Sequence, residues 1–292
     1  MDAMSLPDVF KTSTLRIGVL LPEVLGTYGD GGNAVVLARR SELRGVPAEI
    51  QRIGVTESIP DSLDIYTLGG GEDVAQTIAS RRLQQEKGLY RAVQNGCPVL
   101  AICAAFQILG DWYTDSRGER SPGVGILDAV TLPQGARAIG ELVTSARELD
   151  LGVSLSEALT GFENHGGSTV LGSQAQPLGF VQAGVGNGQP GVAPELDDGI
   201  SREARTSPEH GLTVEIPDGY RAFQDGKPIE GAVQGSIIAT YMHGPCLARN
   251  PQLADLLLAR AFGTSIPDLP SMEEIPGVRR LRQERLAAAG LK

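Results

Sequence analysis

The chain has 292 residues, of which 41% are hydrophobic, and this is ample for one large domain or two small ones. Its net charge of −10 argues against nucleic acid as the main partner, because phosphate contacts need clustered Lys and Arg. The longest apolar run is far shorter than the ~20 residues that span a bilayer, and no secretory signal opens the chain. Three cysteines indicate reduced thiols, so we expect a cytoplasmic protein.

Short apolar strands alternate with amphipathic helices in the first part of the chain. In chain order we predict a strand at 15–21, a helix at 34–44 capped by Asn33 and closed by Gly45, strands at 48–53 and 63–68, a helix at 73–96, a strand at 99–102 and a helix at 104–112. This alternation predicts βαβ units and a mostly parallel sheet. In such sheets ligands gather at the carboxyl ends of the strands.

The second part is less regular. We predict strands at 124–132 and 138–144, paired antiparallel, then long loops with one hairpin from 184 to 235, a strand at 236–242 and a helix from Pro251 to Phe262 that Asn250 caps. A linker and a short basic helix follow. The expected organisation is therefore a tail at 1–14, one domain at 15–262 and a C-terminal extension at 263–292.

Cys103 lies between a buried strand and a helix. This position is typical of a nucleophile elbow, in which the side chain stands on a sharp turn and the helix N-terminus points amides at it. Those amides favour the thiolate, and the N–H of Ala104 could stabilise an oxyanion. The alternative is that Cys103 is a small buried core residue.

A cysteine nucleophile needs an imidazole within hydrogen-bond reach to take and return a proton. The chain has three histidines. His243 follows the strand at 236–242 and could reach the same sheet edge, so we predict that it is the base. His165, between glycines, is the competitor, while His210 lies in the loop-rich region and is expected to be inert.

Glycines follow the strand at 63–68. Gly69 to Gly71 lack the pattern of a phosphate loop, and a peptide nest that completes an oxyanion hole fits them better. The glycines of the 29–33 turn could bind an anion, although a plain tight turn explains them as well. His243 and Cys246 have too few further ligands nearby for a metal site, so we predict none.

Six segments together resemble the class I, triad-type glutamine amidotransferases and, within them, the cobyric-acid-synthase-like branch. They are 28-YGDGGN-33, 68-LGGGEDVAQ-76, 100-LAICAAFQILG-110, 123-GVGILD-128, 161-GFENHGG-167 and 240-TYMHGPCLARNPQLAD-255. They run in family order over most of the chain. The resemblance implies an α/β fold, a flavodoxin-like three-layer domain with a mostly parallel sheet and an antiparallel appendage.

The resemblance also assigns roles to individual residues. It implies that Cys103 is the glutaminase nucleophile and His243 its general base and acid. It places the oxyanion hole at the N–H groups of Gly71 and Ala104. It implies substrate contacts for three further residues: Arg137, whose guanidinium would hold the α-carboxylate of glutamine, Gln107 and Gly70.

The chain departs from the usual family pattern in two places. Ala104 and Ala105 stand where the elbow ordinarily has glycines. No Glu follows His243 by two residues, so no carboxylate of the chain orients the imidazole at that spacing. The resemblance implies that a partner supplies an Asp, and that the isolated subunit is a poor glutaminase.

The expected function is hydrolysis of L-glutamine through a cysteine thioester, with the ammonia delivered to a synthetase. The resemblance implies a MurT-like partner of the Mur-ligase family, which would form a heterodimer with this chain and amidate the D-isoglutamate α-carboxyl of lipid II to D-isoglutamine. No cofactor is expected in this chain, and ATP and Mg are expected on the partner. The alternatives are a glutaminase for a cobyric-acid-type synthetase, a non-catalytic regulatory module on the same fold, and a cysteine hydrolase without a synthetase.

Overall fold

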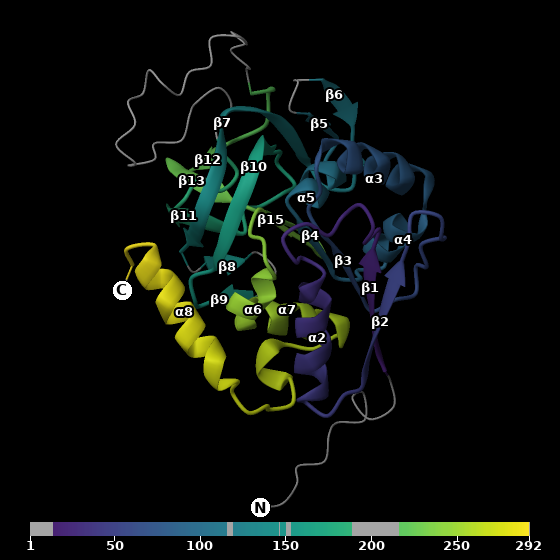
Figure 1. Ribbon diagram of the computed structural model, residues 1–292, viewed down its shortest axis with the longest axis vertical. Helices are drawn as coiled ribbons and strands as arrows, with labels where there is room; N and C mark the ends of the chain where they lie inside the picture. The colour runs from purple at the N-terminus through teal and green to yellow at the C-terminus, as the bar shows by residue number, and fades with distance from the viewer. Residues whose placement is uncertain (1–13, 116–118, 146, 150–152, 189–215, 292) are drawn as a thin grey trace, which may run out of the picture.

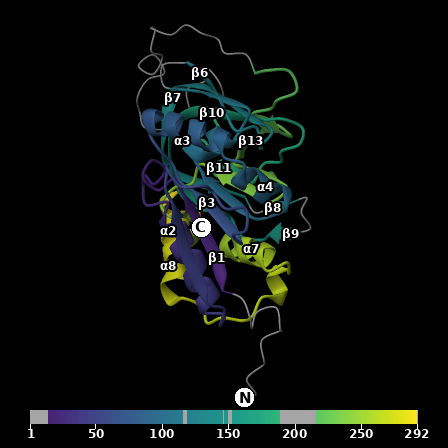
Figure 2. The same ribbon diagram turned by 90° about the vertical axis from the view of Figure 1, so that its right-hand side faces the viewer.

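The computed structural model describes residues 14–115, 119–145, 147–149, 153–188 and 216–291 (Figure 1). The predicted tail, His210 and most of the predicted 184–235 loop region lie outside these residues. Two large sheets dominate the described part of the chain. Figure 2 shows the sheet that contains β7 and β10 above the sheet that contains β1 and β3.

The first sheet has six strands in the order β14-β15-β4-β3-β1-β2. Their bounds are β1 Leu15–Leu20, β2 Ala48–Ile53, β3 Ile65–Leu68, β4 Val99–Ile102, β14 Ala232–Gln234 and β15 Ile237–Thr240. Only β14 runs antiparallel to its neighbour. The five parallel strands have the flavodoxin-like order 2-1-3-4-5, which confirms the predicted fold. β1, β3, β4 and β15 are almost entirely buried, as expected for strands covered on both faces.

Helices connect or follow these strands. Their bounds are α2 Gly32–Glu42, α3 Asp73–Gln85, α4 Gly88–Gln94, α5 Ala104–Leu109 and α7 Pro251–Ala261. The crossover from β1 to β2 runs toward one edge and that from β3 to β4 runs toward the other. Because such crossovers are right-handed, α2 lies on one face and α3 and α4 lie on the opposite face. α2 also packs beside α7, where Asp255 binds Arg40 and Arg44 at 2.7–2.8 Å.

The second sheet is the predicted antiparallel appendage. It contains β5 Trp112–Thr114, β6 Arg120–Pro122, β7 Ala129–Thr144, β10 Thr160–Leu171, β11 Gly179–Ala183, β12 Phe223–Gln224 and β13 Lys227–Glu230. β7 and β10 pair over almost their full length, and only β5 and β7 pair parallel. The short strands β8 Arg147–Leu149 and β9 Val153–Leu155 form a separate pair.

Several predicted elements differ in the structure. The helix predicted at 104–112 ends at Leu109, and Trp112 begins β5. The predicted helix at 73–96 is two helices, because Gly88 packs so closely on the carbonyl of Ile59 that a Cβ there would clash. The strands predicted at 124–132 and 138–144 form one strand from Ala129, since β10 pairs with both sides of the Pro133 region through a register shift. α2 begins at Gly32, so Asn33 is not its cap, although Gly45 ends the helix with φ +82° as predicted.

The chain ends in the predicted short helix. α6 Cys246–Arg249 and a 3-10 turn at Ile266–Asp268 precede α8 Pro276–Ala288, which contacts α6, β7 and β10 (Figure 1). α8 has no buried residue, and it is held by Arg282 and Arg285, which bind the Ala158 carbonyl and Glu141. Within the described ranges, every helix is too short or too polar to cross a membrane.

Candidate active site

Cys103 stands at the C-terminal end of β4, between β3 and β15 in the sheet. Its amide donates to the carbonyl of Thr240 at 2.9 Å, and α5 begins at the next residue, Ala104. Its backbone has φ +52° and ψ −104°, a strained conformation for a residue with a side chain. The side chain is 8% exposed. This is the predicted nucleophile elbow, and the methyls of Ala104 and Ala105 fit inside the core.

His243 follows β15, whose C-terminal end neighbours that of β4. Its amide donates to the carbonyl of Phe162 at 2.9 Å, and the residue is only 1% exposed. Its Nδ1 lies 2.9 Å from Oδ2 of Asp30. The other ring nitrogen, Nε2, is buried without a hydrogen-bond partner in the described part of the chain. Nε2 is therefore free to serve a reacting group.

The charge state of His243 depends on its two neighbours. Burial alone lowers the pKa of the imidazole, but the hydrogen bond with Asp30 and the proximity of Cys103 raise it to about 10. At neutral pH the ring is thus an imidazolium between a carboxylate and a sulfur. A thiolate beside an imidazolium is the form in which a cysteine is nucleophilic.

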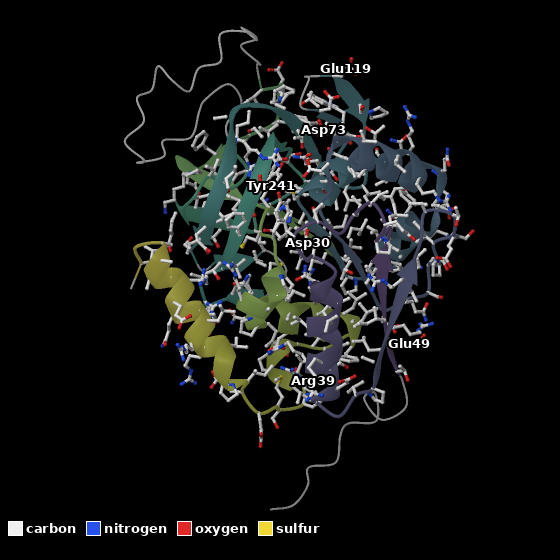
Figure 3. All side chains as sticks on the ribbon, in the orientation of Figure 1. Asp30, Arg39, Glu49, Asp73, Glu119 and Tyr241 are labelled. Atoms are coloured by element: carbon white, nitrogen blue, oxygen red, sulfur yellow. The ribbon has the colours of Figure 1, made fainter. Side chains whose placement is uncertain are left out.

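Asp30 lies in the 28-YGDGGN-33 turn and is 2% exposed. Besides His243, its carboxylate accepts from the amides of Gly70 at 2.8 Å and Gly244 at 3.1 Å. Asn33 of the same turn accepts from the amide of Leu247 at 3.0 Å. The sequence could not distinguish an anion site from a plain tight turn at residues 29–33. In the structure this turn connects the loops that follow β1, β3 and β15. Figure 3 shows Asp30 and Tyr241 in the middle of the molecule.

The triple glycine follows β3 and lies beside the elbow. Gly70 has both main-chain groups paired, its amide with Asp30 and its carbonyl with Thr27. A Cβ on Gly70 would stand 2.6 Å from Cε1 of His243, and one on Gly71 would stand 2.6 Å from the carbonyl oxygen of Val24. Glycine is thus required here for close approach. The oxyanion role of Gly71 and Ala104 stays a prediction, as does substrate contact by Gly70.

The other predicted substrate residues lie in different surroundings. Arg137, exposed on β7, donates through Nε to Oδ1 of Asn164, whose carbonyl oxygen is 3.9 Å from the Cys103 sulfur. Gln107 is buried in α5, and its amide is bound by Gln76 at 2.6 Å and Tyr241 at 3.0 Å. Arg137 is therefore anchored near the nucleophile, whereas the side chain of Gln107 is occupied within the core.

The competing base, His165, has different surroundings. Its Nδ1 donates to the Gly167 carbonyl at 2.8 Å, and its ring stacks on Tyr241 with centroids 3.7 Å apart. Cys246 is fully buried, its sulfur 3.6 Å from Oδ1 of Asn33. Among the residues that the structure describes, no group of three or more His, Cys, Asp or Glu could hold a metal ion.

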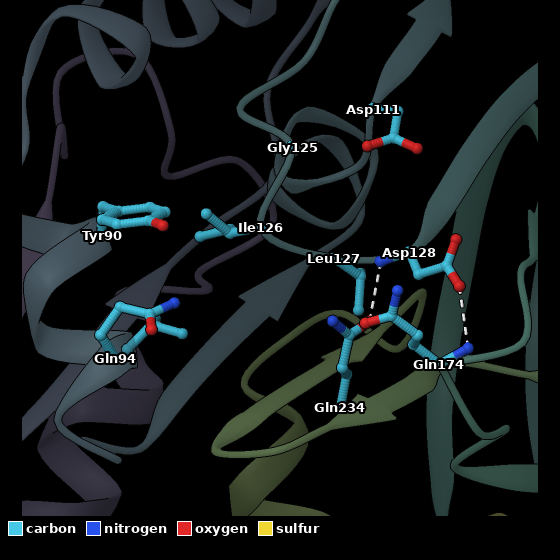
Figure 4. A pocket seen from close by; sticks show the side chains of 10 residues that line it. Tyr90, Gln94, Asp111, Gly125, Ile126, Leu127, Asp128, Gln174 and Gln234 are labelled. Atoms are coloured by element: carbon cyan, nitrogen blue, oxygen red, sulfur yellow. Dashed lines mark hydrogen bonds between the residues drawn. The ribbon is translucent and has the colours of Figure 1, made fainter.

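A polar cavity of about 250 Å³ lies elsewhere in the molecule (Figure 4). It is lined by Tyr90, Val93, Gln94, Asp111, Gly125, Ile126, Leu127, Asp128, Gln174 and Gln234. None of the predicted site residues is among them. The cavity is therefore separate from the Cys103 site.

Comparison with known proteins agrees with this geometry. Residues 16–213 match the family described as the CobB/CobQ-like glutamine amidotransferase domain. The chain belongs to this family. It is thus a glutamine amidotransferase, and the triad-type resemblance read from its motifs is confirmed.

Two kinds of relative show the similarity of this amidotransferase to known proteins. The lipid II isoglutaminyl synthase (glutamine-hydrolyzing) subunit GatD of Streptococcus pneumoniae is 30% identical over 89% of this chain and 86% of its own. The protein of the same name from Staphylococcus aureus is 30% identical over 85% of this chain and 84% of its own. The cobyric acid synthase of Limosilactobacillus reuteri is 29% identical over 77% of this chain but 37% of its own.

Proposed function

We propose that this amidotransferase is the glutaminase subunit of a two-component synthetase that amidates the D-isoglutamate α-carboxyl of lipid II to D-isoglutamine. Cys103 at its strained elbow, next to a buried His243 that Asp30 holds, is the observation that carries the glutaminase part. Similarity to the two lipid II isoglutaminyl synthase subunits along most of their length supports the acceptor. The two subunits match over 89% and 85% of this chain and the cobyric acid synthase over 77%, which favours this acceptor over the cobyric-acid type.

The residues of the site support a two-step reaction. The Cys103 thiolate attacks the side-chain carboxamide carbon of glutamine, and the N–H groups of Gly71 and Ala104 receive the charge on the oxygen. His243 gives its Nε2 proton to the leaving nitrogen, so ammonia departs and a γ-glutamyl thioester remains. Water then loses a proton to His243 and attacks the thioester, which releases glutamate and restores the thiolate.

Asp30 keeps Nε2 of His243 directed at this chemistry by holding Nδ1. The family resemblance implies a partner aspartate at this place, and we propose that Asp30 fills it instead. The isolated chain should then show measurable glutaminase activity, which we propose the partner raises. We further propose a cytoplasmic heterodimer in which a MurT-like Mur-ligase-family partner binds ATP and Mg and receives the ammonia.

Glutamate release tests this function. The rate should be low for the chain alone, rise in the complex with the Mur-ligase-like partner, and vanish in Cys103→Ala. Amidation of lipid II by the complex should consume glutamine and stop in the same variant. Equal rates with and without the partner would indicate a free-standing hydrolase, and no glutamate release under any condition would indicate a non-catalytic module.

A further inference from the structure

Asn164 joins three parts of the site. Its Oδ1 accepts a hydrogen bond from Nε of Arg137, and its Nδ2 donates to the hydroxyl of Tyr28. Its main-chain carbonyl oxygen lies 3.9 Å from the Cys103 sulfur. One residue of β10 therefore contacts an exposed arginine, an exposed tyrosine and the nucleophile.

Tyr28 belongs to the same turn as Asp30. Its ring centroid lies 4.8 Å from that of His243, with 55° between the planes, so the tyrosine covers the imidazole. Tyr28 has φ +58° although it is not glycine, and its side chain is 47% exposed. A strained backbone conformation such as that of Tyr28 is retained only where surrounding contacts stabilise it, and such residues cluster at functional sites.

The link to Asn164 also decides how Arg137 can bind. A guanidinium carries five N–H donors in a planar fork. Within the described ranges Arg137 uses only Nε, toward Asn164, which fixes the plane of the fork and leaves both terminal nitrogens free. Two parallel bonds from those nitrogens suit a carboxylate.

We propose that Asn164 is a positioning residue for glutamine, which sets Arg137 for the α-carboxylate of the substrate. Through its main chain it also fixes the distance between that carboxylate and the Cys103 sulfur, and through Tyr28 it holds the cover of His243. The side-chain carboxamide of glutamine is thereby placed at the nucleophile. This inference rests on the proposed glutaminase function.

Steady-state glutaminase kinetics of the complex with its partner test the inference. Asn164→Ala should raise KM for glutamine about tenfold, the equivalent of one lost charge-assisted contact, and change kcat about twofold at most. Arg137→Ala should raise KM at least as much. In the double variant KM should be no higher than in Arg137→Ala, because Asn164 acts through Arg137. Asn95→Ala, at an exposed position that ends α4, is the matched control.

The rate at which iodoacetamide alkylates Cys103 distinguishes positioning of the substrate from a structural role. If Asn164 only maintained the structure of the site, its loss would change this rate. Iodoacetamide carries no α-carboxylate, so its rate of alkylation of Cys103 should be equal in Asn164→Ala and the parent protein. Tyr28→Phe, which keeps the ring and loses the hydroxyl, should raise KM about threefold, since Asn164 loses one of two anchors.

The inference fails if KM of Asn164→Ala equals that of the parent, if the Asn164 and Arg137 effects multiply in the double variant, or if alkylation of Cys103 slows. An unchanged KM in Tyr28→Phe would also contradict it. Absence of glutaminase activity in the parent complex would instead overturn the proposed function, so the two failures are distinguishable.

Discussion

Nδ1 of His243 lies 2.9 Å from Oδ2 of Asp30, although 213 residues separate the two in sequence. The carboxylate also binds the amides of Gly70 and Gly244, so it is fully engaged and cannot turn away from the ring. The chain thus contains a Cys–His–Asp arrangement of its own.

Loss of the Asp30 charge should disable the base. In Asp30→Asn we expect kcat for glutamine hydrolysis to fall by about two to four orders of magnitude, because an amide can hold the wrong tautomer of His243. The loss should occur in the isolated chain and in the complex alike. Asp61→Asn, at an exposed carboxylate, is the control. Full activity of Asp30→Asn in the complex would show that a partner carboxylate orients the ring.

The same variant should change the pH dependence. Asp30 is one of the groups that raise the pKa of His243 to about 10 against the effect of burial. Activity requires the imidazolium to protonate the leaving nitrogen, so it falls as pH rises through that pKa. Without the Asp30 charge the pKa falls, and the high-pH limb of kcat/KM should move to lower pH. A limb that stays in place would argue against the contact.

Gly70 should tolerate no side chain. In Gly70→Ala the added Cβ would stand 2.6 Å from Cε1 of His243 and 3.3 Å from Oδ2 of Asp30, so the ring must shift. We expect kcat to fall about tenfold or more while circular dichroism stays unchanged. Gly31→Ala is the matched control, because its Cβ would meet no atom within 4 Å. Equal activity of the two variants would contradict the observed packing.

Glu230 should make stability depend on pH. It is fully buried, its Oε1 accepts from Thr240 and Tyr241, and burial together with the charge of Glu163 raises its pKa to about 7. Because the folded-state pKa is raised, its contribution to stability is complete below about pH 4.5 and is lost as pH rises through about 7.

Glu230→Gln keeps the accepting oxygen and never ionises. Compared with the parent, the variant should gain up to roughly 3 kcal/mol in free energy of unfolding near pH 8 and little near pH 5. Denaturant unfolding at both pH values measures this, with the exposed Glu49→Gln as control. An equal effect at the two pH values would mean that Glu230 does not titrate in this range.

The sequence allowed the parallel sheet and the turn at Cys103 to be predicted, because the strand–helix alternation and the strand end are read from local patterns. An apolar run that ends in Cys103 and a helix marks an elbow, and the strand before His243 marks the neighbouring sheet edge. The position of Asp30 could not be predicted this way. It lies 213 residues from His243, in a glycine-rich turn that ordinary turn geometry explains, and only the fold brings the two loops together.

Tertiary contacts also decided what local patterns could not. The apolar spacing continues through residues 73 to 96, but the close approach of Gly88 to Ile59 divides the helix. The sequence predicted separate strands at 124–132 and 138–144, whereas β10 pairs with residues on both sides of 134–137 and joins them in β7. For Asn164, polar residues between glycines gave no sign of its three contacts, and its place opposite Ile139 on β7 depends on strand register.

A diazoketone analogue of glutamine tests the central claim most directly, since it alkylates the residue that attacks the substrate carbonyl. Burial raises the pKa of Cys97 to about 12 and raises that of Cys246 as well, so both thiols should stay unreactive. We predict a single adduct, mapped by peptide mass spectrometry to Cys103, that is lost in Cys103→Ala and slowed in His243→Ala. An adduct on either other cysteine, or undiminished labelling of Cys103 in His243→Ala, would contradict the account.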